Sequence, residues 1–434
     1  LENSNATQLV HHVTLMQTYL NLGLTLQRMG IAVLAPLLLV GCNDEAAGPQ
    51  SIESVNEITP SVFELLNPEL SASAKEIVLK YVEQIGTDLI QARIEIERFQ
   101  SSIVTLADHV SSENLSLSKQ AWLDAHSAYE LTTLHRYFAT QLIGEQNSLA
   151  LMQLQYQINH WPIIPGYIDY VNGYPDSGIV YDINVTLDVD SLREQHGAFD
   201  IYEVTLGFHV IEFLLWGYDT DSVARPAADF DAVLELTPEE TESGYSLEQL
   251  SNNRRRLFLA VAADTLVEDF RALQSLWLTE ESSIRQRIES TSGTELIVIL
   301  ADSMSAMLNQ ELLLRSLYPM LNGDFVESIQ SPYSRSTQNA VSSQLSGLER
   351  LLLEHQTENG TTLDLIFSAI SDEFSEFFYQ NFDASKACLV LLYSNRERDS
   401  AGTTNERETE IVECINLLTN IIDYNDRLKF DLTN

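Results

Sequence analysis

The amino-acid sequence predicts an all-α fold made of two packed helical bundles of the four-helix type. Apolar residues recur at helical spacing along both halves of the chain, as at Ile77, Tyr81 and Ile85. No long stretch alternates apolar and polar residues as a half-buried β-strand does. With 434 residues, 44% of them hydrophobic, the chain is long enough to form more than one core. We therefore expect a first bundle over residues 71–280 and a second over 281–434.

A short apolar run, Ile31–Leu39, precedes the sequence Leu-Val-Gly-Cys that ends at Cys42. The run is too short to span a bilayer but has the length of a signal-peptide core. Its end resembles the bacterial lipoprotein box, in which the cysteine is lipidated and becomes the mature N-terminus. The alternative is an N-terminal hydrophobic helix with a chance cysteine. We expect a leader over residues 1–41 and a lipid-anchored tether over 42–70, because the residues after Cys42 are polar and lack a period.

The apolar pattern also places the helices along the chain. Pro162 should end a helix just before it, and Gly217 follows a central helix as a C-terminal glycine does. The charged segment Asp399–Glu410 is expected to be a loop. Helices are expected from about Ser71 and over Ser118–Leu142, Phe199–Trp216, Ser251–Trp277, Glu295–Leu321, Val341–Leu353, Leu363–Phe382 and Cys414–Leu428.

The stretch Gly207–Gly217 is apolar almost all round, which predicts a buried helix. Its two polar side chains, His209 and Glu212, are three residues apart and so lie on one face of that helix. Burying an unpaired carboxylate costs on the order of several kcal/mol, so Glu212 needs a partner. The pair is either a structural hydrogen bond or ion pair, or part of a site for a metal ion or polar ligand.

The common signatures of phosphate-binding loops, serine hydrolases, redox cysteines and zinc proteases are absent from the sequence. His209 and Glu212 supply two candidate metal ligands, whereas an open catalytic zinc site uses three from the protein. Glu130, Glu203 and Asp229 are acidic residues within reach in sequence that could add oxygen ligands, and we choose Glu130 and Asp229 as the candidates. Imidazole and carboxylate together suit iron or zinc, so a divalent or ferric ion is the expected cofactor.

The formal net charge of -39 makes nucleic acid an unfavourable partner, because the protein would repel a polyanion. The most basic stretch, Arg254–Arg256, is expected to face solvent or pair with acids rather than bind phosphate. His160 and His355 have no charged partner nearby in sequence, and we expect both to be structural.

Two cysteines remain in the body of the chain, Cys388 and Cys414. In an oxidising periplasm they could form a disulfide. The alternative is a pair of buried thiols.

The central stretch Gly207–Gly217 resembles the Gly-x-His-x-x-Glu signature of the imelysin family. Asn159-His160-Trp161-Pro162 is similar to the Trp-Pro segment of that family, and Arg225-Pro226-Ala227-Ala228-Asp229-Phe230 to its Arg-Pro-x-x-Asp-Phe segment. The next helix, with Arg254–Arg256, matches as well. Ser331-Pro332-Tyr333-Ser334 resembles its second-half Ser-x-Phe-Ser element. The resemblance covers most of the mature chain in consistent order.

The resemblance implies two bundles with pseudo-two-fold internal similarity, a place on the periplasmic side of the envelope of a Gram-negative bacterium, at the outer membrane, and a role tied to iron. Members of the family include insulin-cleaving membrane proteases, iron-regulated proteins and components of iron uptake. It makes His209 and Glu212 the site pair and Asp229 a further ligand or supporting group. The chain departs from the family at Thr132-Thr133, where Thr-Glu is common, and at Arg335, where Asp is usual.

Three hypotheses follow. The first is an envelope lipoprotein that binds a metal ion or iron-bearing ligand and serves iron uptake, with a membrane anchor and a possible uptake partner in the envelope. The second is a zinc-type metallopeptidase, in which the ion activates water. The third is a non-catalytic scaffold for a partner protein, in which His209 and Glu212 affect stability alone.

Overall fold

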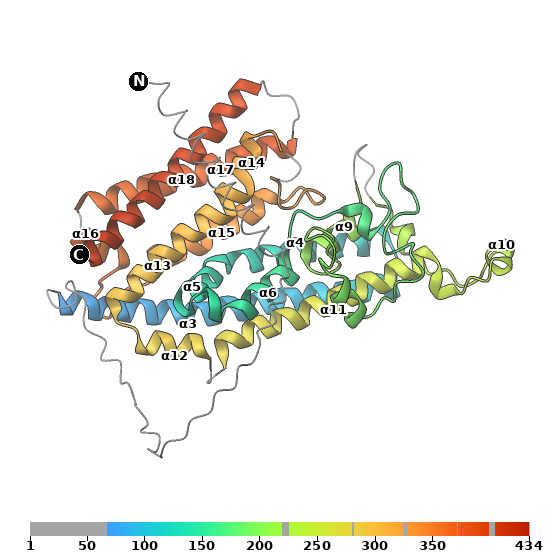
Figure 1. The fold of residues 1–434 in the computed structure, drawn as a ribbon, viewed down its shortest axis with the longest axis horizontal. Coiled ribbons are helices and arrows are strands. Elements are labelled where there is room, and N and C mark those ends of the chain that lie inside the picture. Colours follow the sequence, from blue (N-terminus) through green and yellow to red (C-terminus); the bar gives the residue numbers. More distant parts are fainter. Residues whose placement is uncertain are drawn as a thin grey trace, which may run out of the picture. The chain divides into compact units, whose positions relative to one another are not determined.

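Every regular element that the structure describes is a helix, which confirms the predicted all-α fold (Figure 1). The computed structural model describes residues 67–218, 225–279, 282–324, 328–370, 372–398 and 404–433. Within these ranges β-type pairing is limited to two isolated bridges. The predicted leader over residues 1–41, Cys42 and the tether as far as residue 66 lie outside them. Residues 59–434 form one compact unit.

The predicted helices are present, several of them with different bounds. The α-helices of the first part of the unit are α3 (Pro68–Asp108), α4 (Ser112–Leu131), α5 (Thr133–Ile143), α6 (Leu149–Asn159), α7 (Pro165–Ile168), α8 (Val189–Gln195), α9 (Phe208–Trp216), α10 (Pro238–Glu242) and α11 (Ser251–Leu278). Those of the second part are α12 (Ser283–Ser290), α13 (Gly293–Met307), α14 (Tyr318–Leu321), α15 (Thr337–Leu353), α16 (Leu363–Ile370), α17 (Asp372–Arg398) and α18 (Thr404–Thr433). Short 3₁₀ turns lie at Glu145–Asn147, Ala227–Phe230 and Leu247–Gln249.

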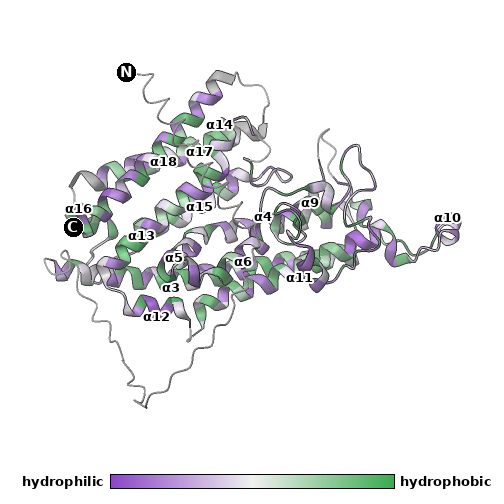
Figure 2. Ribbon diagram, viewed as in Figure 1, coloured by the Kyte–Doolittle hydropathy of each residue, from purple (hydrophilic) through white to green (hydrophobic). Residues whose placement is uncertain are grey.

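Helix α3 is the element against which both parts of the chain pack. It begins with Pro68 in its first turn, where the missing proline N–H removes no helical hydrogen bond. Its apolar stripe is buried against α4, α11 and α13, and α4 in turn packs against α15 (Figure 1). In Figure 2 hydrophobic and hydrophilic residues lie side by side along these helices, as expected when one face is buried.

The helix predicted over Ser118–Leu142 is divided into α4 and α5. The Thr132 hydroxyl donates to the Tyr129 carbonyl and the Thr133 hydroxyl to the Glu130 carbonyl, each over 2.7 Å. Such bonds compete with the helical ladder and end α4 at this point. Helix α15 crosses close by, because a Cβ atom at Gly347 would lie 2.3 Å from the carbonyl oxygen of the last residue of α4.

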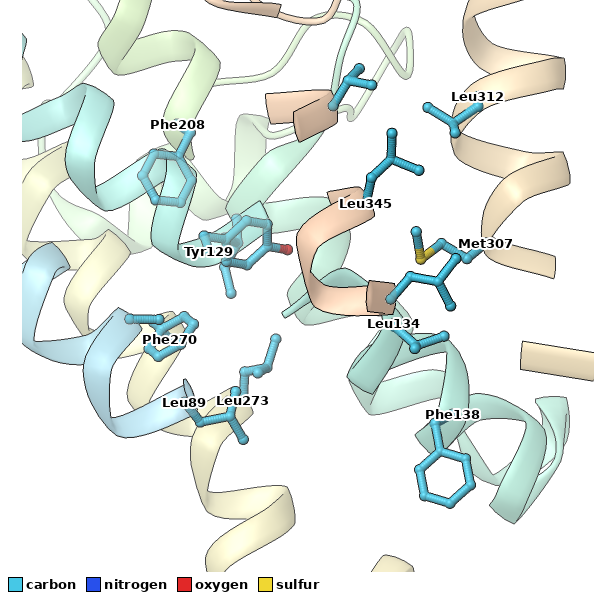
Figure 3. Packing of buried hydrophobic residues seen from close by; sticks show 14 of the residues in the cluster. Leu89, Tyr129, Leu134, Phe138, Phe208, Phe270, Leu273, Met307, Leu312 and Leu345 are labelled. Atoms are coloured by element: carbon cyan, nitrogen blue, oxygen red, sulfur yellow. The ribbon is translucent and has the colours of Figure 1, made fainter. Parts of the chain in front are cut away.

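One apolar cluster runs through both predicted bundles. Figure 3 shows Tyr129 of α4, Phe208 of α9 and Phe270 of α11 on one side, with Leu345 of α15 and Met307 of α13 opposite them. All five belong to the same cluster of buried side chains. The predicted boundary falls between α11 and α12, and the division into two bundles stays a prediction because the core is continuous across it.

The helix predicted over Glu295–Leu321 is present as a continuous helical segment. Its middle, Leu308–Leu317, is a π-helix between α13 and α14. π-Helical turns are rare and occur mostly as single turns within α-helices, frequently at functional sites. This one carries Arg315, whose guanidinium lies 4.4 Å from the ring centre of Trp161 and donates to the Trp161 carbonyl.

The C-terminal helices α17 and α18 are joined by a disulfide between Cys388 and Cys414, with 5.7 Å between their Cα atoms. This decides between the two states predicted for these cysteines. The charged loop expected over Asp399–Glu410 is wrong from Thr404 onwards, because that part is the first turns of α18. Acidic residues near a helix N-terminus are favoured by the helix dipole, so the charge that predicted a loop suits the start of a helix.

Candidate functional site

Helix α9 begins later than the sequence predicts. Gly207 precedes it with φ of 94°, and a Cβ atom there would lie 2.5 Å from the Gln157 carbonyl oxygen. The close approach of another backbone, rather than a local signal, therefore fixes the start at Phe208. Residues 199–207, which were expected to be helical, lie outside α9. The predicted end at Gly217 is confirmed, with φ of 75°.

His209 and Glu212 form the predicted pair on one face of α9. His209 Nδ1 lies 2.9 Å from Glu212 Oε2, and both side chains are almost completely buried. The other carboxylate oxygen, Oε1, accepts from the N–H and the hydroxyl of Ser334, each over 2.7 Å. Both oxygens of the buried carboxylate are thus hydrogen-bonded. His209 Nε2 is buried and has no hydrogen-bond partner among the residues that the structure describes.

The protonation state of Glu212 decides what His209 Nε2 can do. Burial raises the pKa of Glu212 to about 7, although the bonds from Ser334 oppose this. Burial also lowers the pKa of His209 well below its ordinary value, so the ring is neutral at neutral pH. When Glu212 is ionised, it accepts from Nδ1–H and the lone pair is on Nε2. When Glu212 is protonated, it donates to Nδ1, and Nε2 carries the proton.

Glu130, the first added ligand proposed from the sequence, lies near His209 but is used as a hydrogen-bond acceptor. Oε1 accepts from Asn159 and Gln330, and Oε2 accepts from Gln344 and Thr133. Burial alone would raise the pKa of Glu130, but the hydrogen bond and charge of His126 hold it well below its ordinary value. The carboxylate therefore joins α4, α6, α15 and the segment before α15.

Asp229, the second added ligand, lies in a different cluster. It accepts from the Tyr170 hydroxyl over 2.7 Å and from Arg225 Nη1 over 3.1 Å. Arg225 Nη1 also lies 2.8 Å from Asp169 Oδ2, and Asp169 is the partner of Arg255 through both of its oxygens. We find Asp229 balanced by arginine charge rather than beside His209.

The arrangement fits an ion that brings its own ligands better than a bare ion. In the ranges that the structure describes, no three His, Cys, Asp or Glu side chains are grouped as metal ligands. Among the described residues His209 Nε2 has no hydrogen-bond partner, as is also true of Nε2 of His160, His196 and His355, and it carries a lone pair when Glu212 is ionised. His209 Nδ1 faces a carboxylate, as in most metal-bound histidines. A bare zinc ion needs three or four protein ligands, which these residues do not supply.

The three consecutive arginines are not a solvent-facing patch. Arg254 is buried and donates to four backbone carbonyls of the segment between α7 and α8. Arg255 is buried on Asp169, and Arg256 donates to the carbonyls of Phe230 and Ala107. The sequence correctly predicted pairing with an acid for Arg255, and the solvent-facing alternative is wrong for Arg254 and Arg255.

Burial keeps the two histidines that were expected to be structural neutral, although the charges of Glu354 and Asp88 act in the opposite direction on the pKa of His355. Burial lowers the pKa of His160 to about 3, and it also lowers the pKa of His355. A third histidine, His196, accepts at Nδ1 from the N–H groups of Thr205 and Leu206, just before α9. Burial lowers its pKa to about 4. These rings are neutral parts of the fold.

His196 should make the protein less stable in mild acid. The unfolded histidine binds a proton below about pH 6.5, whereas the folded one does so only near pH 4. The contribution of neutral His196 to the free energy of unfolding is therefore fully present above pH 6.5. It is lost as the pH falls towards 4, and at pH 5 the loss is about 2 kcal/mol. Urea unfolding measures the free energy of unfolding at pH 7 and at pH 5. Between these two pH values it should fall by about 2 kcal/mol less in His196→Gln than in the parent protein. Equal losses in both proteins would contradict the assignment.

Sequence reasoning missed the partners that complete the site. Ser334 belongs to the Ser-Pro-Tyr-Ser element that was noticed, but nothing local shows that it bonds to Glu212, 122 residues away. Gln330 and Gln344 are likewise distant from Glu130. Thr133, by contrast, is adjacent on the same turn, and a hydroxyl three residues after a glutamate is a signal that local geometry offers.

Comparison with known proteins gives the following matches. The family model described as Imelysin matches residues 88–422. No curated protein matches the sequence. Among solved structures, the chain is similar to a protein assigned as an iron-regulated protein A precursor from Parabacteroides distasonis ATCC 8503, with a TM-score of 0.57 and 13% identity. The match covers 83% of this chain and 95% of that one, and at this identity it shows the fold alone.

Proposed function

This chain belongs to the imelysin family, and from that premise we propose that it binds an iron-bearing ligand or a metal ion through His209. We propose further that it does so in the bacterial envelope, anchored through a lipid on Cys42, where it serves iron uptake with an envelope partner. The iron-regulated description of the structural neighbour supports the link to iron.

The observation that carries the proposal is the unpartnered, buried Nε2 of His209. Leaving a buried polar atom unsatisfied costs about 1–3 kcal/mol, which a ligand on this atom would recover. Within the described ranges Nε2 of His160, His196 and His355 is also unpartnered, and His209 differs from them in the bond between its Nδ1 and a buried carboxylate. Glu212 orients the ring from the other side, and Ser334 fixes Glu212. A ligated iron needs one further donor, and this imidazole supplies one.

Binding is favoured over peptide hydrolysis by the surrounding chemistry. A catalytic zinc needs several protein ligands and a free carboxylate that acts as base. Here both oxygens of Glu212 are engaged, and Glu130 accepts from four side chains. These carboxylates support the imidazole and the fold.

The proposal predicts that iron binding depends on His209 and on the proton that Glu212 controls. The purified full chain is mixed with ferric citrate or with Zn²⁺, desalted, and its bound metal is measured. We expect bound iron in the parent and none in His209→Ala. In Glu212→Gln the amide donates to Nδ1, which places the proton on Nε2, and affinity should fall about 10- to 100-fold.

His355→Ala is the matched control, because His355 Nε2 is also buried without a partner but lies elsewhere. This variant should bind iron as the parent does. A parent that binds neither metal, with His209→Ala merely melting earlier, would make the pair structural and remove the proposal. A peptide-cleavage assay on the metal-loaded sample separates a binding protein from a peptidase.

A further inference from the structure

Arg225 is a buried arginine in which only part of the guanidinium group contacts carboxylates. Its side chain is fully buried, and Nη1 alone contacts the two carboxylates of Asp169 and Asp229. Nε and Nη2, which form one edge of the guanidinium, are buried and have no hydrogen-bond partner in the described parts of the chain. That edge is the one that binds carboxylates and phosphates through two parallel hydrogen bonds.

In the same cluster, the corresponding edge of Arg255 binds the carboxylate of Asp169. Arg255 Nε lies 2.6 Å from Asp169 Oδ2, and Arg255 Nη2 lies 3.0 Å from Asp169 Oδ1. The two arginines, with Asp169 and Asp229, make a group of two positive and two negative side chains. Its charges balance, yet one of its two guanidinium edges has an anion and the other has none.

Lys119 of α4 adds a second positive charge close enough to Arg225 to feel its charge. Its ammonium lies 5.4 Å from the ring centre of Trp216, and Arg225 N–H donates to the Trp216 carbonyl over 3.0 Å. Burial and the charge of Arg225 together lower the pKa of Lys119. Among the described residues no carboxylate pairs with Lys119, although the chain has 63 acidic residues against 24 lysines and arginines.

The backbone at Gly217 lies close to the open edge of Arg225. Gly217 has φ of 75°, and a Cβ atom there would lie 3.3 Å from Arg225 Cβ and 3.5 Å from Nε. A side chain at position 217 would therefore press on the open edge. Lys119 and Trp216 are both partly exposed, whereas the edge of Arg225 is buried, so an anion would reach it from the side of Lys119 and Trp216.

We propose that Arg225 and Lys119 form a binding site for a small oxyanion, a carboxylate or a phosphate group, beside the C-terminal end of α9. The anion accepts from Nε–H and Nη2–H of Arg225 and neutralises the extra charge of Lys119. The strong negative charge of the whole chain restricts the ligand to a small molecule, because a polyanion is repelled. The site does not depend on whether His209 binds iron.

The test is calorimetric titration of the full chain with sodium acetate and, separately, with sodium phosphate, at constant ionic strength and without metal. Binding of either anion is expected, and the tighter one identifies the group as carboxylate or phosphate. Lys119→Gln, a partly exposed position, should weaken binding at least threefold. Arg225→Lys keeps a charge for the two aspartates but removes the edge, and it should weaken binding at least tenfold.

Lys80→Gln is the control, because Lys80 is a partly exposed lysine on α3 that pairs with Glu76. It should leave the affinity unchanged. If Arg225→Lys does not fold, the test is the comparison of anion affinity between Lys119→Gln and Lys80→Gln. Absence of binding by the parent up to about 20 mM of both anions, or equal binding by Lys119→Gln and the parent, would overturn the proposal.

Discussion

Replacing Asp169 by alanine is expected to lower the free energy of unfolding by about 3–5 kcal/mol. Asp169 is fully buried and bonds to both Arg225 and Arg255. Its removal leaves two buried guanidinium groups to share Asp229, and charges left in this way are costly because water cannot reach them. Urea unfolding followed by circular dichroism measures the loss.

Glu97→Ala is the matched control, because Glu97 also bonds to two arginines, Arg93 and Arg271, but on the surface. Solvent screens the contacts of Glu97 with the two arginines, so the free energy of unfolding should fall by less than about 1 kcal/mol in Glu97→Ala. Equal losses in Asp169→Ala and Glu97→Ala would show that burial does not decide the strength of these pairs, contrary to our expectation.

The second large effect is expected for Glu130→Gln, which should lower the free energy of unfolding by about 3 kcal/mol. The substitution preserves shape but replaces an acceptor with an NH₂ group. Both oxygens of Glu130 now accept from side-chain donors, including Gln330 and Gln344, so one donor would face another. Each lost hydrogen bond to a buried charge is worth about 1.5–3 kcal/mol.

The pH dependence of the difference in free energy of unfolding between the parent and Glu130→Gln tests whether the charge of Glu130 causes it. The pKa of Glu130 is held below its ordinary value, so its stabilising effect is present above about pH 4.5 and is lost only in stronger acid. The gap between parent and Glu130→Gln should therefore stay constant from pH 8 to about pH 5 and narrow below that. A gap that closes near neutral pH would assign the effect to another group.

Local periodicity was enough to predict most of the helices. The stripe of apolar residues that begins near Ile77 is the buried face of α3, and α11 differs from its predicted range by a single residue. The errors arise where other forces act. The start of α9 depends on a backbone approach at Gly207, and the break after α4 depends on two threonine hydroxyls, neither of which changes the apolar pattern.

In the candidate site, only the contact between residues on the same helical turn could be predicted from the sequence. The spacing of His209 and Glu212 gave their contact, because residues three apart on a helix are neighbours. Glu130 was chosen for its charge, and Asp229 for its charge and for its place in the segment that resembles the imelysin family. The bond from Ser334 to Glu212 depends on how distant segments pack, whereas Arg225 is only four residues before Asp229.

The bond between Cys388 and Cys414 gives this protein a stability that depends on its redox surroundings. It closes a loop with a sequence separation of 26 residues and so restricts the unfolded chain. A loop of that length corresponds to about 3.5 kcal/mol in the chain-entropy treatment. In an oxidising compartment the folded chain keeps this contribution, whereas among reduced glutathione and thioredoxin it would lose it. The same sequence therefore has two free energies of unfolding, and the thiol–disulfide balance around it selects between them.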